Sequence, residues 1–411
     1  MRRCRLGKIH ILFVDDHPEV LNGLKRMCRS MRGQWEPSFA NGGEQAISMM
    51  QADRFDVLVT DMRMPGVGGL EVLRSALSLQ PEMVRIVLSG QYDTDDFIRS
   101  GWPAHRFLAK PCDADTLKGA INQVLVMRSL LDNQQLKGLI AGAERLPSLP
   151  CIYFDIEQEL NREHASMQRV GEIISRDVGI TAKVLQMANS PIFGCRRWID
   201  NPEQAVVMLG ADVIKALTLY IQACSAMPVP EGISLQRIFA HSLIVARLAR
   251  EIAAEQGQPK SVCSEAFLAG MLQNIGSLVL LSSFPDTYLE IVARAEQQGR
   301  PVWELEREIL GGNHAEIGGY LISLWGLSMP VVAAVAYHIH PSQCPYVEKP
   351  FALTAVHVAN AIEKEPGING AVINNEFDFE YLEQNGLLTS LASWQQLHQK
   401  IISANEERLC R

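Results

Sequence analysis

HILFVDD, residues 10–16, decides the fold of the first part of this chain. Its first five residues form a short, mostly apolar run, and two aspartates follow it directly. Runs of the same kind recur at DVLVT (56–60), RIVLS (85–89) and HRFLA (105–109), each bounded by polar or turn-forming residues. Short runs that contain β-branched residues and have such boundaries predict β-strands.

Amphipathic stretches separate these strands. VLNGLKRMCRSM (20–31), GGEQAISMM (42–50) and GLEVLRSALSL (69–79) carry apolar residues at helical spacing. Strands and helices in alternation indicate a parallel sheet that is covered on both faces. With WEPSFA (35–40) as a further strand, we expect a doubly wound α/β domain with a five-stranded parallel sheet.

Polar residues follow the predicted strands where a doubly wound sheet forms its crevice. Asp15 and Asp16 end the first strand, Asp61 the third, Ser89 the fourth and Lys110 the fifth. Three carboxylates in one pocket repel one another unless a hard cation shares them, and oxygen ligands suit Mg²⁺. We therefore predict a magnesium site in which Asp61 is the nucleophile that becomes an aspartyl phosphate, with the lysine and the hydroxyl on the other phosphoryl oxygens.

This set resembles the receiver domain of two-component response regulators, a flavodoxin-like fold, over about residues 8–130. The stretch VTDMRMPG (59–66) matches the phosphoacceptor motif, and FLAKP (107–111) matches the motif of the lysine. The resemblance implies metal binding by Asp15, Asp16, Asp61 and the Arg63 backbone carbonyl, switch positions at Ser89 and Phe107, and a cis peptide bond from Lys110 to Pro111. It also implies a sensor histidine kinase or a phosphotransfer protein as the phosphoryl donor.

Beyond Pro111 the pattern becomes helical. Residues 113–146 are predicted to form the last helix of the first domain and a helical linker, and LPSLP (146–150) is a proline-punctuated boundary. Helical patterns dominate from there to about residue 363, and one or two further helices are expected in the tail. The predicted domains are 8–128, a helical linker 129–145, an all-α domain 146–365, and a helical extension of that domain, 366–411.

The order of motifs in the helical part resembles the HDOD domain, a relative of the HD phosphohydrolases, over about residues 140–365. ANSPIFG (188–194) is its most specific stretch, and GMLQNIG (270–276) and HAEIGGYLISLWGL (314–327) follow in order. A catalytic HD domain binds its metal with a His, a His-Asp pair and a later Asp. The matching positions are His241, then Gln273 with Asn274, then Asn360.

Three of these four positions carry neutral amides, which are weak metal ligands and compensate little of a divalent charge. The resemblance therefore implies a degenerate, non-catalytic HD site with no cofactor, and a domain that binds an unidentified signalling partner. The alternative is a receiver-regulated phosphodiesterase or nucleotidase, acting for example on a cyclic dinucleotide. It would depend on residual side chains, namely His314, His338, His340, Glu265 and Glu316.

Composition limits which binding partners, cysteine chemistry and cellular location can be expected. The chain has 411 residues, a formal net charge of −8 and nine cysteines, with no C-x-x-C pair. The charge argues against broad attraction to nucleic acid, and we expect no direct nucleic-acid binding. The cysteines predict reduced thiols rather than disulfides or a zinc ribbon. No segment approaches 18 uninterrupted apolar residues, so we expect no membrane span and a cytoplasmic protein, with homodimerisation left open.

Overall fold

The computed structural model divides the chain into two compact units, one up to Cys151 and one comprising Ile152–Ser323 and Leu327–Arg411. It describes residues 8–409 apart from positions 32, 90–103, 111, 131–150, 161, 163, 190–198, 228, 231–232, 347–348, 364, 367–371 and 374–375. The predicted linker 129–145 beyond Leu130, the LPSLP boundary and most of ANSPIFG thus fall outside the described residues.

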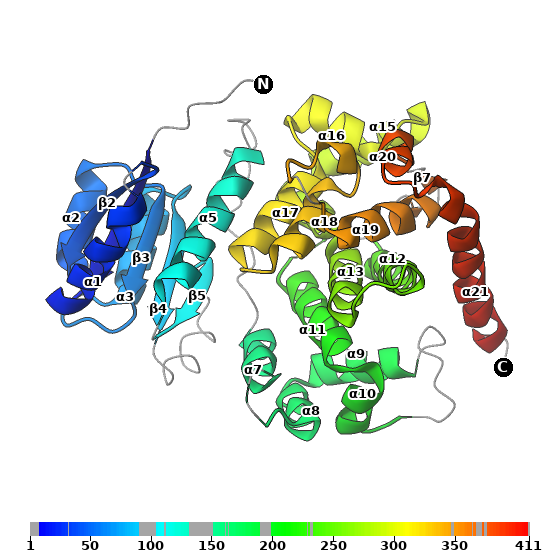
Figure 1. Ribbon diagram of the computed structural model, residues 1–411, viewed down its shortest axis with the longest axis horizontal. Coiled ribbons are helices and arrows are strands. Elements are labelled where there is room, and N and C mark those ends of the chain that lie inside the picture. The colour runs from blue at the N-terminus through cyan, green and yellow to red at the C-terminus, as the bar shows by residue number, and fades with distance from the viewer. Residues whose placement is uncertain are drawn as a thin grey trace. The chain divides into compact units, whose positions relative to one another are not determined.

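The first unit is a doubly wound α/β domain (Figure 1). Its strands are β1 (Ile9–Asp15), β2 (Trp35–Asn41), β3 (Val57–Asp61), β4 (Val84–Ser89) and β5 (Arg106–Ala109), all parallel in the order β2-β1-β3-β4-β5. The helices are α1 (Pro18–Cys28), α2 (Gly43–Ala52), α3 (Gly69–Leu79) and α5 (Ala114–Leu130), with a short 3₁₀ turn η1 (Arg29–Met31). The predicted fold class is confirmed, including WEPSFA as a strand.

Both faces of this sheet are buried. Leu12 and Val14 pack with side chains of α2 and α3 in one hydrophobic cluster. Ile11 and Phe13 alternate with them along β1 and are also fully buried. Because successive side chains of a strand point to opposite faces, a strand with consecutive buried side chains requires cover on both sides. This explains why residues 11–14, ILFV, form a continuous apolar run rather than an alternating one.

The second unit is almost entirely helical (Figure 1). Its elements are α7 (Cys151–Leu160), α8 (Met167–Ser175), α9 (Val178–Ala188), α10 (Pro202–Leu209), α11 (Ala211–Ala226), α12 (Leu235–Glu255), α13 (Lys260–Leu272), α14 (Ile275–Ser283), α15 (Pro285–Gln298), α16 (Val302–Leu310), α17 (His314–Leu324), α18 (Met329–Tyr337), η3 (Pro341–Gln343), α19 (Phe351–Ile362), α20 (Phe379–Gln384), η4 (Leu388–Ser390) and α21 (Leu391–Leu409). The short strands β6 (Glu365–Pro366) and β7 (Val372–Ile373) form an antiparallel pair that the sequence did not predict.

Helix α13 lies at the centre of this unit, in contact with α11, α12, α18 and α19. Among the described residues, the segment Lys260–Ser283 passes a length-and-apolarity test for a membrane span, and 83% of its apolar window is buried inside the unit. The pair α10 and α11 would pass only if counted as one span despite a bend of 115°. Burial of this kind is that of a core helix.

The stretch GMLQNIG does not form one regular helix. Helix α13 ends at Leu272 and α14 begins at Ile275, and Asn274 between them departs from helical geometry, with φ −96° and ψ 12°. Gly276 faces the backbone of α17 so closely that a Cβ there would lie 1.9 Å from the carbonyl oxygen of His314. The glycine thus permits the close packing of α14 against α17.

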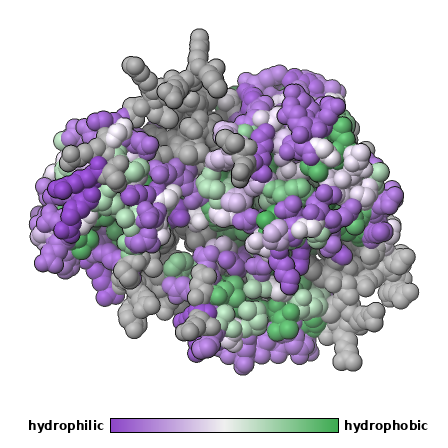
Figure 2. All heavy atoms as spheres, in the orientation of Figure 1, coloured by the Kyte–Doolittle hydropathy of each residue, from purple (hydrophilic) through white to green (hydrophobic). Residues whose placement is uncertain are grey.

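The visible surface of the protein is mostly hydrophilic, and hydrophobic side chains gather in the region of α9 and α10 (Figure 2). Two valines contribute exposed apolar surface there: Val178 at the start of α9 is 83% exposed, and Val207 on α10 is 69% exposed. Isolated exposed apolar residues are common on proteins, so the exposure of these two valines on adjoining helices is only a candidate contact area.

Candidate functional site

The first unit contains an acidic pocket formed by Asp15, Asp16 and Asp61 at the carboxyl ends of β1 and β3. Ligand atoms of these aspartates and of His17 lie within 4.8 Å of one another. Asp15 is only 1% exposed and Asp61 8%. Parallel pairing of β1 with β3 brings their carboxyl ends to the same edge, which explains the convergence.

Backbone amides orient two of the three carboxylates. The N–H of His17 donates to Asp15 Oδ1 over 2.8 Å, and the N–H of Met62 donates to Asp61 Oδ1 over 2.8 Å. Helix α3 begins so close to the end of β3 that a Cβ on Gly69 would lie 2.4 Å from the carbonyl oxygen of Asp61. The glycine therefore allows the tight loop that follows the aspartate.

Lys110 connects the two buried carboxylates. Its Nζ lies 2.8 Å from Asp61 Oδ1 and 3.1 Å from Asp15 Oδ2. Burial by itself would lower the pKa of Lys110, but the hydrogen bonds and negative charges of Asp61 and Asp15 outweigh burial and raise the pKa. The lysine is therefore a fixed positive charge at the aspartates, 31% exposed at its side chain.

The donor set of the acidic pocket fits a hard divalent cation. Asp15, Asp16 and Asp61 offer oxygen atoms in a cluster of the right size, and Lys110 neutralises only part of their charge. The backbone carbonyl of Met62 accepts the N–H of Gly69 at 3.1 Å, so it is already used within the loop. The backbone carbonyl of Arg63 stays the predicted further ligand.

Three further predicted residues cannot be placed. Ser89 and Phe107 belong to β4 and β5, but their side chains lie outside what the structure describes, and Pro111 is outside the described residues altogether. One neighbour of the acidic pocket was missed at the sequence level: His17 Nδ1 lies 3.1 Å from Asp16 Oδ1. Its position directly after the two aspartates was the available signal.

The second unit brings the four HD-like positions into its buried core. His241, Gln273, Asn274 and Asn360 are each at most 3% exposed. They come from α12, the junction between α13 and α14, and α19, which pack on one another. His241 is fixed at both ring nitrogens: Nε2 lies 3.3 Å from the carbonyl oxygen of Glu363, and Nδ1 lies 3.3 Å from Asn274 Nδ2.

The residual histidines have mainly structural partners. His314 contacts Glu306 Oε2 through Nδ1 at 2.7 Å and through its backbone N–H at 2.8 Å. His338 Nδ1 lies 2.8 Å from the carbonyl oxygen of Val335. Burial and then the nearby His314 lower the pKa of His338 to about 3, so this side chain is neutral at physiological pH. His340 is half-buried against Trp303, with ring centroids 4.5 Å apart.

The two glutamates of the hydrolase alternative, Glu265 and Glu316, also form hydrogen bonds with other residues. Glu265 Oε1 accepts a hydrogen bond from Ser328 at 3.2 Å. Glu316 and Asn313 exchange side-chain to backbone hydrogen bonds at the start of α17, as in a capping box. Within the described part of the chain, the acidic pocket with His17 is the only group of three or more His, Cys, Asp or Glu ligand atoms within 4.8 Å. The buried histidines therefore do not converge as a ligand set.

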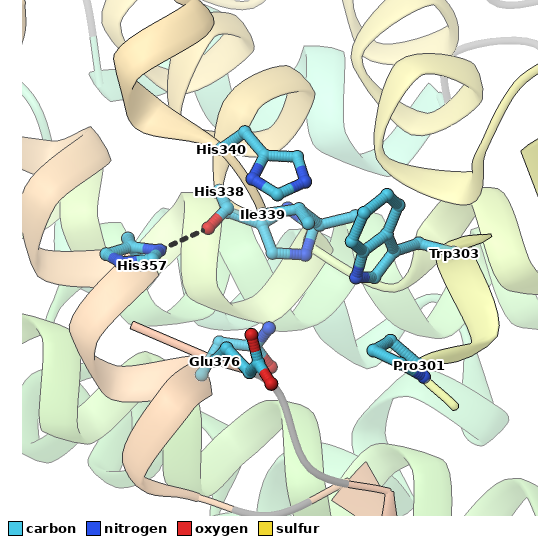
Figure 3. A pocket seen from close by; sticks show the side chains of 8 residues that line it. Pro301, Trp303, His338, Ile339, His340, His357 and Glu376 are labelled. Atoms are coloured by element: carbon cyan, nitrogen blue, oxygen red, sulfur yellow. Dashed lines mark hydrogen bonds between the residues drawn. The ribbon is translucent and has the colours of Figure 1, made fainter. Parts of the chain in front are cut away.

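His357 is a core residue that the sequence did not single out. Its Nδ1 donates to the carbonyl oxygen of His338 at 2.7 Å (Figure 3), and its Nε2 accepts the backbone N–H of Asp378 at 2.9 Å. Burial, before all other influences, lowers the pKa of His357 to about 4. The residue thus links α18, α19 and the segment before α20, and only its place three residues before Asn360 could have indicated it.

Comparisons with known proteins agree with this division. The response regulator receiver domain family matches residues 11–122, and the HDOD domain family matches residues 146–341. Response regulator GacA of Pseudomonas aeruginosa is 30% identical over 130 residues, which are 31% of this chain and 59% of GacA. The chain spans about half the length of the curated relatives it matches.

Two solved structures resemble a large part of this chain. One, from Marinobacter aquaeolei VT8 and provisionally named a signal transduction protein, is 20% identical with a TM-score of 0.51 and covers 71% of this chain and 65% of its own. That level of identity supports the fold alone. Another, from Shewanella amazonensis and provisionally named a phosphohydrolase, is 26% identical with a TM-score of 0.48 and covers 65% of this chain and 95% of its own. The two family matches together show that this chain consists of an N-terminal response regulator receiver domain and a C-terminal HDOD domain.

Proposed function

We propose that this chain is a phosphorelay response regulator that accepts a phosphoryl group on Asp61 and transmits this state to a non-catalytic HDOD domain. The observation that carries the proposal is the position of Lys110 Nζ, 2.8 Å from Asp61 and 3.1 Å from Asp15 within the acidic pocket. A carboxylate nucleophile beside a fixed positive charge is what transfer of a phosphoryl group requires.

In this proposal an oxygen of the Asp61 carboxylate attacks phosphorus, a new O–P bond forms, and the bond from phosphorus to the donor's leaving group breaks. The ammonium of Lys110 neutralises negative charge as the phosphoryl oxygens approach. Mg²⁺ bound by Asp15, Asp16 and Asp61 would supply further positive charge against the same oxygens. The donor is a sensor histidine kinase or a phosphotransfer protein, as for receiver domains in general.

We further propose that the HDOD domain is a binding module for a signalling partner rather than a hydrolase. The amide side chains of Gln273, Asn274 and Asn360 support this, because they cannot compensate the charge of a divalent metal. The exposed Val178 and Val207 on α9 and α10 offer an apolar contact area for a protein partner. A coupling of roughly 1–3 kcal/mol between phosphorylation and partner binding would change the affinity about 5- to 150-fold.

Phosphorylation of the purified chain by a small phosphodonor in the presence of Mg²⁺ tests the first part. We expect one acid-stable, base-labile phosphoryl group per chain, and its loss in Asp61→Asn. Asp53→Asn removes an exposed carboxylate from the same domain and is the matched control. Labelling that survives Asp61→Asn would refute the assignment.

Differential capture tests the second part. The chain with a phosphoryl mimic bound and the Asp61→Asn variant are used as baits, and partners that differ between the two baits are identified. Reduced capture by Val178→Lys or Val207→Lys would locate the contact area. The hydrolase alternative has a separate test: stoichiometric metal in the purified helical domain together with turnover under added Mn²⁺ would replace the binding-module proposal.

A further inference from the structure

A small pocket in the helical unit lies beside the amide of Asn360, and its chemistry is unlike that of the acidic pocket. We call it the Trp303 pocket; it is lined by Pro301, Trp303, His338, Ile339, His340, His357, Asn360 and Glu376 (Figure 3). Its volume of about 30 Å³ corresponds to roughly one or two water-sized groups. The pocket therefore suits a compact chemical group rather than a whole nucleotide.

Two buried side chains of the pocket present hydrogen-bond acceptors that have no partner. The carbonyl oxygen of Val335 can only accept, so the nearby His338 Nδ1 carries the proton, and His338 Nε2 is left as a lone pair. Neither His338 Nε2 nor Asn360 Oδ1 has a hydrogen-bond partner, although the two residues are 1% and 3% exposed. Burial of an acceptor without a donor is unfavourable, so both atoms indicate a ligand that donates hydrogen bonds.

His357 differs from its two neighbours. Both of its ring nitrogens are used, one by the carbonyl oxygen of His338 and the other by the backbone N–H of Asp378. It therefore contributes a wall to the pocket without offering a further acceptor. The available acceptors on the inner side are those of His338 and Asn360.

The remaining walls favour a positive charge. The rings of Trp303 and His340 meet edge to face at 4.5 Å, and the carboxylate of Glu376 lies across the pocket from them (Figure 3). An indole ring attracts a cation to its face, and a carboxylate at the entrance pairs with it. Glu376 is exposed, so it can meet a ligand without a large cost of burial.

The charges around His340 add to this preference. Carboxylates of Asp378, Glu304 and Glu316 act on the His340 ring, opposed by the guanidinium of Arg307. Arg307 in turn is paired with Glu316. A predominantly acidic entrance repels phosphate groups, which separates this pocket from a site for phosphoesters.

We infer that the Trp303 pocket binds the primary ammonium group of a small amine. The three N–H donors of such a group match three acceptors, namely His338 Nε2, Asn360 Oδ1 and the carboxylate of Glu376, while its charge lies near the Trp303 ring. The inference does not depend on phosphorylation at Asp61. A free amine and a lysine side chain share this chemistry, and the experiment distinguishes them.

Calorimetric titration of the full chain with methylammonium chloride at constant ionic strength tests the inference. We expect saturable binding of one methylammonium per chain and no saturable binding of sodium, inorganic phosphate or tetramethylammonium. Tetramethylammonium carries the same charge but has no N–H donor and is too large for the pocket. Equal binding of tetramethylammonium, or no saturable methylammonium binding, would overturn the inference.

Variants sharpen the test. Glu376→Gln should weaken methylammonium binding at least tenfold, whereas Glu383→Gln, an exposed carboxylate of the same region, should leave it within twofold. Asn360→Leu and Trp303→Leu should each abolish saturable binding, and Trp303→Phe should retain it. If Asn360→Leu fails to fold, the comparison of Glu376→Gln with Glu383→Gln still tests the inference. Equal methylammonium affinities of these two variants would refute it.

Two further measurements distinguish a free amine from a protein lysine, and amine binding from phosphorylation at Asp61. Tighter binding of Nα-acetyl-lysine amide than of methylammonium, by tenfold or more, identifies a protein lysine as the natural ligand, whereas equal or weaker binding identifies a free amine. Asp61→Asn should bind methylammonium as the wild type does. A protein that loses phosphorylation but keeps amine binding shows that the two sites fail independently.

Discussion

Asn274 occupies the one nitrogen of His241 that could bind a metal. Nε2 of His241 lies 3.3 Å from the carbonyl oxygen of Glu363, which can only accept, so Nε2 carries the proton. The lone pair of Nδ1 therefore accepts from Asn274 Nδ2, 3.3 Å away. Both ring nitrogens of His241 are therefore used by groups of the protein itself.

Removal of this amide should destabilise the helical unit. Asn274→Ala leaves His241 Nδ1 buried without a donor, and we expect the free energy of unfolding to fall by about 1–3 kcal/mol. Urea unfolding followed by tryptophan fluorescence measures the change. Gln384→Ala, which removes an exposed amide hydrogen-bonded to Glu380, should change it by less than about 0.5 kcal/mol. Equal effects of the two changes would contradict the structural role of Asn274.

Restoration of the ligands should restore metal binding. The triple change Gln273→His, Asn274→Asp and Asn360→Asp rebuilds the HD ligand set around His241, whose surroundings already place these positions together. We expect the variant to bind about one Mn²⁺ per helical unit, with the wild type binding none there. Both proteins are titrated with Mn²⁺ by calorimetry in an Asp61→Asn background, so that the acidic pocket does not account for a difference in the heat of binding. Metal binding by the unaltered amide set would show that our interpretation of these positions is wrong.

Loss of Lys110 should make the receiver domain depend on divalent cations. Lys110→Met leaves Asp15 and Asp61 close together and nearly buried without their shared ammonium, which we expect to cost roughly 1–2 kcal/mol after allowance for solvent at the partly exposed lysine. Mg²⁺ binds the folded state and should recover much of this loss. The rise in Tm on addition of Mg²⁺ should therefore be larger in Lys110→Met than in the wild type. Lys118→Met, beside an exposed aspartate, is the control.

The buried histidines should make the helical unit sensitive to acid. The pKa of His338 is lowered to about 3 and that of His357 to about 4, both below the value of 6.5 expected in an unfolded chain. Between those limits the unfolded chain binds more protons, so stability is fully present above pH 6.5 and falls as the pH falls towards 4 and then 3. Each histidine contributes about 1.4 kcal/mol per pH unit over its window. Urea midpoints at pH 7 and pH 5 measure the loss, which His338→Asn should reduce and His164→Asn, at an exposed histidine, should leave unchanged.

Sequence patterns predicted the strands and the acidic pocket because both depend on local order. A parallel sheet brings the residues after its strands to one edge, so Asp15 and Asp61 could be placed together from their positions alone. The core of the helical unit could not be derived in this way. The contact between His357 and His338 joins residues from different helices, and no spacing rule links them. Likewise, the break at Asn274 depends on tertiary packing around Gly276.

The contacts of the last two helices set a practical lower limit on the size of the helical unit. Tyr381 and Trp394 are almost completely buried, and the hydroxyl of Tyr381 hydrogen-bonds Thr354 of α19. His357 also receives the backbone N–H of Asp378, well beyond the last residue of the family match. A protein shortened to residues 146–341 would expose an interior surface and lose α19 itself, so biochemical work on the isolated output domain should retain the chain through α21.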